Sequence, residues 1–296
     1  MMYVIVSTSI STQAQQSPGK DAMLKGFQDS LLTSAEDIFL AENTVQRFEQ
    51  NARFIRLLVT ALKTPGSYDF GFDSLKKVSV VRSPDNAFRI FSWSVPAEQG
   101  TYRFFGTVQL RTADGSLRLY PLIDETLNFS DNNQISDNKH WYGARYYEII
   151  PLEMPGQKIC YALLGWKGNN SRTTKKVIEV LSLDEQGLRF GKPLFTGRKN
   201  EPARNRIVFE YNKLNSMTLR LDKKEQMIIF DHLVPIDTAM KGNYEYYGSD
   251  SSYDGYRLLG NTLKLIENVQ PKNDPNALDE LYTDPKRKDI PVTKKF

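Results

Sequence analysis

The spacing of hydrophobic residues differs between two parts of the chain, and the spacing in the first part predicts a helix. Between residues 35 and 63, apolar residues recur at alternating steps of three and four, which is the spacing of one helix face. Ser34 and Asp37 fit a capping box at its start, and Pro65-Gly66 stops it. The sequence therefore predicts one helix over 35–63, with a shorter helix before it around residues 21–32. The apolar positions are Ile38, Ala41, Val45, Phe48, Ala52, Ile55, Val59 and Leu62.

The width of this stripe leaves two interpretations open. Phe39, Leu40, Phe54, Leu57 and Leu58 widen the apolar surface beyond a two-stranded seam, which favours a helix lying along the core of a domain. The alternative is a coiled-coil arm, because the steps also match a heptad repeat. That alternative predicts a homodimer through helix 35–63.

From residue 77 the period changes to two. Alternating segments rich in aromatic and β-branched residues are typical of strands, and Asp114-Gly115 forms a hairpin turn between two of them. The predicted strands are 77–83, 87–95, 101–111, 116–123, 141–151, 158–166, 175–183, 188–195, 206–212, 216–222, 226–235, 256–259 and 262–269.

Closely spaced strands without alternating helices predict a mainly β fold. We expect antiparallel sheets that form a sandwich, a barrel or a partial propeller, with an N-terminal helical element. The expected organisation is a leader at 1–16, the helical element at 17–66, an antiparallel β domain at 75–270 and a polar tail at 271–296.

Composition narrows the chemistry that this fold can support. The chain has two histidines, His140 and His232, and one cysteine, Cys160, so most zinc sites, Ser-His triads and Cys-His dyads cannot be assembled. The net charge is only +4, and basic residues are interleaved with acids, which does not favour a nucleic-acid partner. The cluster Lys286-Arg287-Lys288 fits a solvated tail. We expect no cofactor.

The first residues predict export. An apolar run from Tyr3 to Ile10 is followed by small residues at Thr12 and Ala14, which suits cleavage by signal peptidase after Ala14, although a basic segment before the run is missing. A single cysteine is compatible with an oxidising compartment. No stretch approaches the roughly 18–20 apolar residues of a membrane span. We therefore expect a periplasmic or extracellular protein without a transmembrane segment.

Candidate binding residues lie near the C-terminal end of the β region: Asp231, His232, Tyr247, Asp250 and Asp254. Oxygen ligands in the segment 250–255 suit a hard cation, but the spacing is not that of an EF-hand, so a surface turn is expected and no metal site is assigned. The polar loop with Asp131, Asn132, Asn133, Asp137 and Asn138 is interpreted in the same way.

The two histidines are expected to be structural. Asp231 and His232 are neighbours on a strand and point to opposite faces, so they cannot form a dyad with each other. His232 can still pair with a remote acid as a hydrogen-bonded histidine. His140 precedes Trp141 and Tyr142, which we expect to pack at a sheet end. The alternative is an exposed cluster that stacks on a sugar or a base.

Four acids within strands, Glu148, Glu179, Glu210 and Asp231, are the candidates for carboxylate chemistry. Two such groups about 5–10 Å apart in a cleft can hydrolyse a glycosidic bond. We expect instead that they face outward on half-solvated sheets, so no catalytic residue is assigned.

The segments YALLGWKGNN, KKVIEVLSLDEQGLRFGKPLF, RIVFEYN, MIIFDHLVP and YYGSDSSYDGY together resemble a group of uncharacterised bacterial extracytoplasmic proteins, over roughly residues 75–270. The resemblance implies a β-rich exported protein and no activity. The leading hypothesis is an exported non-catalytic binding or structural protein, such as a cell-envelope accessory with a protein or glycan partner. The alternative is a carboxylate-dependent glycan hydrolase.

Overall fold

The computed structural model describes residues 19–185, 187–197 and 201–270, and it confirms a mainly β fold. Two helices come first, α1 (Lys20–Leu40) and α2 (Thr44–Leu62). Strands follow in three sheets, with short 3-10 helices between some of them. The expected leader at 1–16 and the tail at 271–296, with its Lys286 cluster, lie outside the described residues.

The strands pair almost entirely antiparallel, as predicted, and among the strands of the described residues only β10 and β15 pair in parallel. The first sheet has the order β1 (Ser79–Arg82), β2 (Phe88–Pro96), β3 (Tyr102–Leu110), β4 (Arg118–Ile123). The central sheet has the order β5 (Ser136–Asp137), β9 (Gly187–Phe190), β8 (Thr173–Asp184), β7 (Cys160–Gly168), β6 (Arg145–Leu152), and β11 (Arg206–Asn212) also pairs with β8. The third sheet has the order β10 (Phe195–Thr196), β15 (Thr262–Val269), β14 (Tyr247–Leu259), β13 (Met227–Pro235), β12 (Leu219–Asp222).

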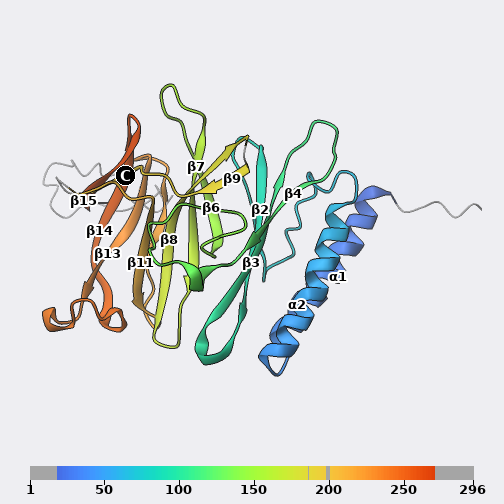
Figure 1. Cartoon of the computed structure of the whole chain (residues 1–296), viewed down its shortest axis with the longest axis horizontal. Helices are drawn as coiled ribbons and strands as arrows, with labels where there is room; N and C mark the ends of the chain where they lie inside the picture. The colour runs from blue at the N-terminus through green and yellow to red at the C-terminus, as the bar shows by residue number, and fades with distance from the viewer. Residues whose placement is uncertain (1–18, 186, 198–200, 271–296) are drawn as a thin grey trace, which may run out of the picture.

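These elements stack as four layers, in the order helices, first sheet, central sheet and third sheet (Figure 1). One hydrophobic cluster fills each of the three spaces between layers. The central sheet is buried on both faces: Tyr161 and Leu163 enter the cluster beside the first sheet, whereas Ala162 and Leu164 enter the cluster beside the third. This explains why β7 is apolar at consecutive positions. The sheets of the described chain do not close into a barrel.

The helical region corrects one prediction. The single helix over 35–63 is wrong, because the chain becomes extended at Ala41 and a second helix starts at Thr44. Asn43 caps that helix by accepting a hydrogen bond from the Gln46 amide at 3.0 Å. Ser34 lies inside α1 and caps nothing. The heptad pattern continued across the break, so periodicity alone could not show it.

The packing of the helices is as expected for a core helix. Phe54, Leu58, Ala61 and Leu62 of α2 are buried in the cluster between the helices and the first sheet, whereas Val45 at the other end is 69% exposed. Association of two copies through residues 35–63 stays a prediction.

Buried polar contacts fix the helices to the first sheet. The Asn51 carboxamide oxygen on α2 accepts a hydrogen bond from Trp93 Nε1 on β2 at 2.7 Å. The guanidinium of Arg89 on β2 donates to the carbonyl oxygens of Ser67 and Phe70, each at 2.6 Å. Burial lowers the pKa of Arg89 to about 9. These contacts position the segment that connects α2 to the first sheet.

Candidate functional site

The sequence-selected residues of the third sheet form one pair rather than one site. His232 Nδ1 lies 2.7 Å from Asp254 Oδ2, and Asp254 Oδ1 accepts a hydrogen bond from the Asn268 amide at 3.0 Å. The pairing of β13 with β14 shifts between Asp231 and Leu233, which places His232 in an irregularity of the strand. Asp231 instead accepts a hydrogen bond from the Thr218 amide at 2.9 Å. The expectation that Asp231 and His232 do not form a dyad with each other is confirmed.

Asp250 and Tyr247 lie on strand β14, so the expectation of a surface turn at 250–255 is wrong, and both make local contacts. The Asp250 carboxylate accepts hydrogen bonds from the Ser252 hydroxyl at 2.7 Å and from the Ser252 amide at 2.9 Å, and these bonds lower the pKa of Asp250. The Tyr247 hydroxyl accepts a hydrogen bond from the Gly242 amide at 3.0 Å. Within the described residues, no group of three or more His, Cys, Asp or Glu side chains could hold a metal ion.

The four strand acids correct another prediction. Glu179 has no exposed side-chain surface and Asp231 is 8% exposed, so the expectation that both face outward is wrong. Glu148 accepts a hydrogen bond from the Leu221 amide at 3.2 Å, and partial burial raises its pKa. Glu210 forms an ion pair with Lys175 at 3.1 Å. Each acid therefore binds a different group.

Glu179 lies at an interruption in the edge of the central sheet. Strand β8 pairs with β9 at Leu181 and with β11 at Glu179, so its neighbour changes between these positions. The Arg206 Nε at the start of β11 donates to Glu179 Oε1 at 2.5 Å, and both side chains are fully buried. The Tyr146 hydroxyl donates to the other Glu179 oxygen. The guanidinium also lies over the Tyr142 ring, 4.5 Å from its centroid.

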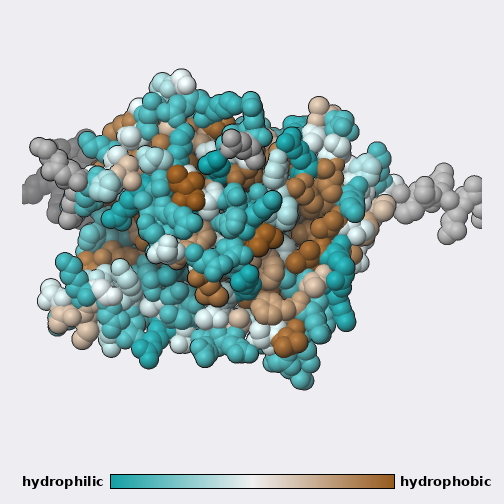
Figure 2. All heavy atoms as spheres, viewed as in Figure 1, coloured by the Kyte–Doolittle hydropathy of each residue, from teal (hydrophilic) through white to brown (hydrophobic). Residues whose placement is uncertain are grey.

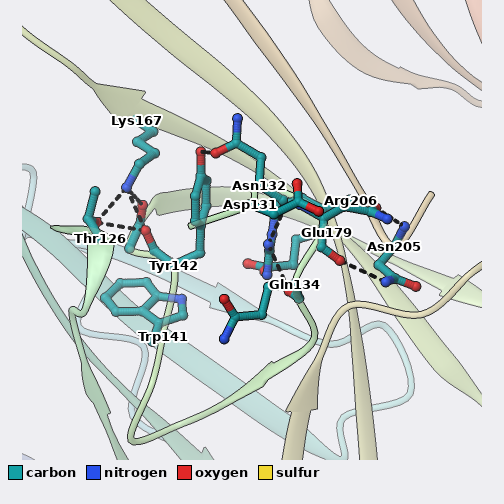
Figure 3. A network of polar contacts seen from close by, with 12 residues as sticks. Thr126, Asp131, Asn132, Gln134, Trp141, Tyr142, Lys167, Glu179, Asn205 and Arg206 are labelled. Carbon is teal, nitrogen blue, oxygen red and sulfur yellow. Dashed lines mark hydrogen bonds and ion pairs between the residues drawn. The ribbon is translucent and has the colours of Figure 1, made fainter. Parts of the chain in front are cut away.

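Arg206 directs a second nitrogen, Nη1, at a surface loop. Its Nη1 donates to the carbonyl oxygens of Asn132 at 2.6 Å and Gln134 at 3.2 Å. Asn205, next to it, donates through its backbone amide and its side chain to Asn133, at 2.6 and 2.7 Å. Figure 3 shows Arg206 and Asn205 beside the loop residues Asp131, Asn132 and Gln134. We call residues 131–135 the clamped loop.

A second buried cation fixes the other side of this arrangement. The Lys167 ammonium on β7 donates to the carbonyl oxygens of Tyr142 and Gly143, at 2.5 and 2.8 Å, and to Thr126 Oγ1 at 2.7 Å (Figure 3). Burial lowers the pKa of Lys167 to about 7. The Tyr142 hydroxyl donates to Asn132 Oδ1 at 2.9 Å. Both cations therefore act on the clamped loop, one directly and one through Tyr142.

The clamped loop forms a wall of a surface cavity of about 460 Å³, which we call the loop pocket. Its Asp137 and His140 are paired, with Oδ1 and Nδ1 3.0 Å apart. Although partial burial acts to raise it, hydrogen bonds from His140 and nearby backbone amides keep the pKa of Asp137 below its usual value. Arg189 on β9 lies opposite Asp137 in the strand register. The pocket is lined by Gln134, Ile135, Ser136, Asp137, His140, Leu188 and Arg189.

The structure confirms the packing expected for the aromatic pair after His140. Trp141 and Tyr142 are buried, at 0% and 2% exposure, so they offer no stacking surface. The sequence reasoning treated the loop as solvated turns and missed the buried charges below it. A usable signal was present: Glu179 is a lone acid in an otherwise apolar segment of β8, and Arg206 precedes a similar segment.

Comparisons with protein-family models, with curated proteins and with solved structures found no match for this chain. The resemblance to bacterial extracytoplasmic proteins therefore stays a prediction. Among the described residues, neither helix has the length and apolar character that crossing a membrane requires.

Proposed function

We propose that the chain is an exported, non-catalytic binding protein that takes a polar ligand in the loop pocket. The observation that carries this proposal is the Glu179–Arg206 pair, whose charges are fully buried while Arg206 holds the backbone carbonyls of a surface loop. A buried ion pair is a weak source of stability, because desolvation offsets most of the attraction. Its position beneath a pocket wall favours a role in fixing the geometry of that wall.

A fixed wall favours binding because a loop ordered in advance loses less conformational freedom when a ligand arrives. The cavity volume of about 460 Å³ falls in the range of sites for small ligands. The pocket brings the carboxylate of Asp137 and the guanidinium of Arg189, which also forms an ion pair with Asp184 at 3.5 Å, together with the apolar side chains of Ile135 and Leu188. These groups suit a ligand with both an anionic group and a hydrogen-bond donor, carried on a partly apolar frame.

The test is a ligand screen that also measures turnover. Zwitterionic peptides and amino sugars that carry a carboxylate are added to the full chain, thermal unfolding is followed, and the ligand is recovered and analysed. We expect at least one compound to raise the unfolding temperature, to be recovered unchanged, and to lose its effect with Asp137→Asn or Arg189→Ala. Asp250→Asn is the matched control, because the Asp250 carboxylate accepts hydrogen bonds from Ser252 on the same strand and does not line the loop pocket, and this variant should retain binding.

Two results would overturn the proposal. One is hydrolysis of a glycan that is abolished by replacing Glu148, Glu179, Glu210 or Asp231. The other is a screen in which no compound stabilises the wild-type chain.

Export is supported by the leader-like pattern of residues 3–14 and by a single cysteine, Cys160, which is buried and free. If the leader is cleaved after Ala14, the protein recovered from the periplasm or the medium starts at Gln15. N-terminal sequencing of protein from fractionated cells measures this directly. Recovery from the cytoplasm with residues 1–14 still attached would contradict export.

A further inference from the structure

A second cavity lies at one end of the third sheet, where that sheet meets the end of β11, and it shares no lining residue with the loop pocket. Its volume is about 340 Å³, and we call it the tyrosine cleft. The segment after β13 and the short helix η4 (Tyr244–Tyr246) form one side, and the end of β11 forms the other. It is lined by Asn212, Asn215, Val234, Ile236, Glu245, Tyr246, Gly248 and Ser249.

Large apolar and aromatic side chains are exposed around this cleft. Ile236 is 83% exposed and Tyr246 is 42% exposed, and both line the cleft. Leu214, next to Asn215, and Tyr244, two residues before Tyr246, are 93% and 43% exposed. Figure 2 shows the corner of the molecule at the end of these loops, at the lower left, with white and light brown atoms. A local concentration of exposed apolar surface is typical of a recognition site.

The backbone around the cleft is tied down by hydrogen bonds. The Asn212 carboxamide donates to the Glu245 carbonyl at 2.6 Å, and the Asn215 carboxamide donates to the Tyr247 carbonyl at 3.1 Å. The Ile236 amide donates to the Tyr246 carbonyl at 2.9 Å. The backbone that carries Tyr246 is therefore ordered before a ligand binds, so binding loses less conformational entropy.

We propose that the tyrosine cleft binds a neutral oligosaccharide. A tyrosine ring is a rigid surface for the apolar face of a sugar ring, while carboxamide and carboxylate groups exchange hydrogen bonds with hydroxyl groups. The one Asp, Glu, Lys, Arg or His side chain in the lining, Glu245, already forms an ion pair with Arg172 at 3.2 Å. The cleft thus lacks a free cation for an acidic ligand, which favours an uncharged one.

Isothermal titration of the full chain tests this inference with a panel of neutral hexasaccharides of glucose, xylose, mannose and N-acetylglucosamine. We expect one of them to bind and Tyr246→Ala to raise its dissociation constant about fivefold to tenfold, as the loss of one aromatic contact implies. Tyr246→Phe keeps the ring and should bind within about twofold of the wild type. Asn215→Ala should also weaken binding.

Asp137→Asn is the matched control: it changes the loop pocket and should leave oligosaccharide affinity unchanged. This separates the two proposals, since each pocket has its own ligand and its own variant. The inference is overturned if no hexasaccharide binds, if Tyr246→Ala binds as well as the wild type, or if Asp137→Asn removes the binding.

Discussion

Replacing Glu179 by glutamine tests whether the buried ion pair is as tightly coupled as the structure indicates. Glu179→Gln keeps the shape of the side chain but leaves the Arg206 guanidinium charged, with no exposed surface and no anionic partner. Breaking a buried pair from one side costs about 3 to 5 kcal/mol of unfolding free energy. The Tyr146 hydroxyl also loses its anionic acceptor, which adds to the loss.

A second ion pair on the same two strands provides a matched control. In the β8–β11 register, Arg206 faces Glu179 and Glu210 faces Lys175, but the side chains of Glu210 and Lys175 are 21% and 16% exposed. Glu210→Gln should therefore cost only about 1 kcal/mol, because solvent compensates the remaining charge. Comparing Glu179→Gln with Glu210→Gln therefore separates the effect of full burial from the effect of losing any cross-strand ion pair.

Urea denaturation followed by tryptophan fluorescence and by circular dichroism measures these losses. The double variant Glu179→Leu/Arg206→Met should be more stable than either single variant, since no uncompensated charge remains. The reasoning is refuted if Glu179→Gln costs no more than Glu210→Gln, or if the two single losses simply add in the double variant.

Further predictions concern other buried groups, each measured by urea denaturation. The pKa of Lys167 is about 7 in the folded chain and about 10.4 when unfolded, so the unfolded state binds more protons between these values. The unfolding free energy of the wild type should therefore increase relative to that of Lys167→Met as the pH rises from 7 to 10. A difference between the two that does not change with pH would contradict this. Asn51→Ala should cost about 1 to 3 kcal/mol because Trp93 Nε1 loses its buried acceptor, and the loss should shrink in a Trp93→Phe background. Gly143→Ala should cost at least about 1 to 2 kcal/mol, because φ is +77° and the new Cβ would lie 2.7 Å from Asp124 Oδ1, so an unchanged midpoint would be evidence against this local geometry.

The strands were predictable because alternation reports which side of a strand meets a core. The hairpin predicted at Asp114-Gly115 connects β3 to β4, as its turn residues indicated. The stacking of three sheets was not predictable, since a period of two does not say what covers a sheet. The consecutive apolar residues of β7 were the main sequence signal for a sheet buried on both faces.

The errors over residues 35–63 and at Glu179 share a physical cause. In each case the prediction assumed the usual surroundings of such a sequence pattern, and the fold provides different ones. Asn43 caps a new helix and so separates it from α1, although the apolar spacing in the sequence continues across this position. Glu179 was predicted to lie on the solvated face of a sheet. In the structure it lies on the same face of β8 as Val177 and Leu181, inside a core. Its partner Arg206 is distant in sequence, so only the fold could bring the charges together.

The central claim is that buried charges hold the clamped loop in a binding-ready shape, and hydrogen exchange tests it most directly. In the structure the Gln134 amide donates to the Asp131 carbonyl at 3.1 Å, and the Asn133 amide donates to the Asp131 carboxylate at 2.8 Å. We predict that residues 131–135 exchange slowly in the wild-type chain, and that in Arg206→Met exchange accelerates more there than in the third sheet, where only the loss of global stability acts. Fast exchange of this segment in the wild-type chain would contradict the claim.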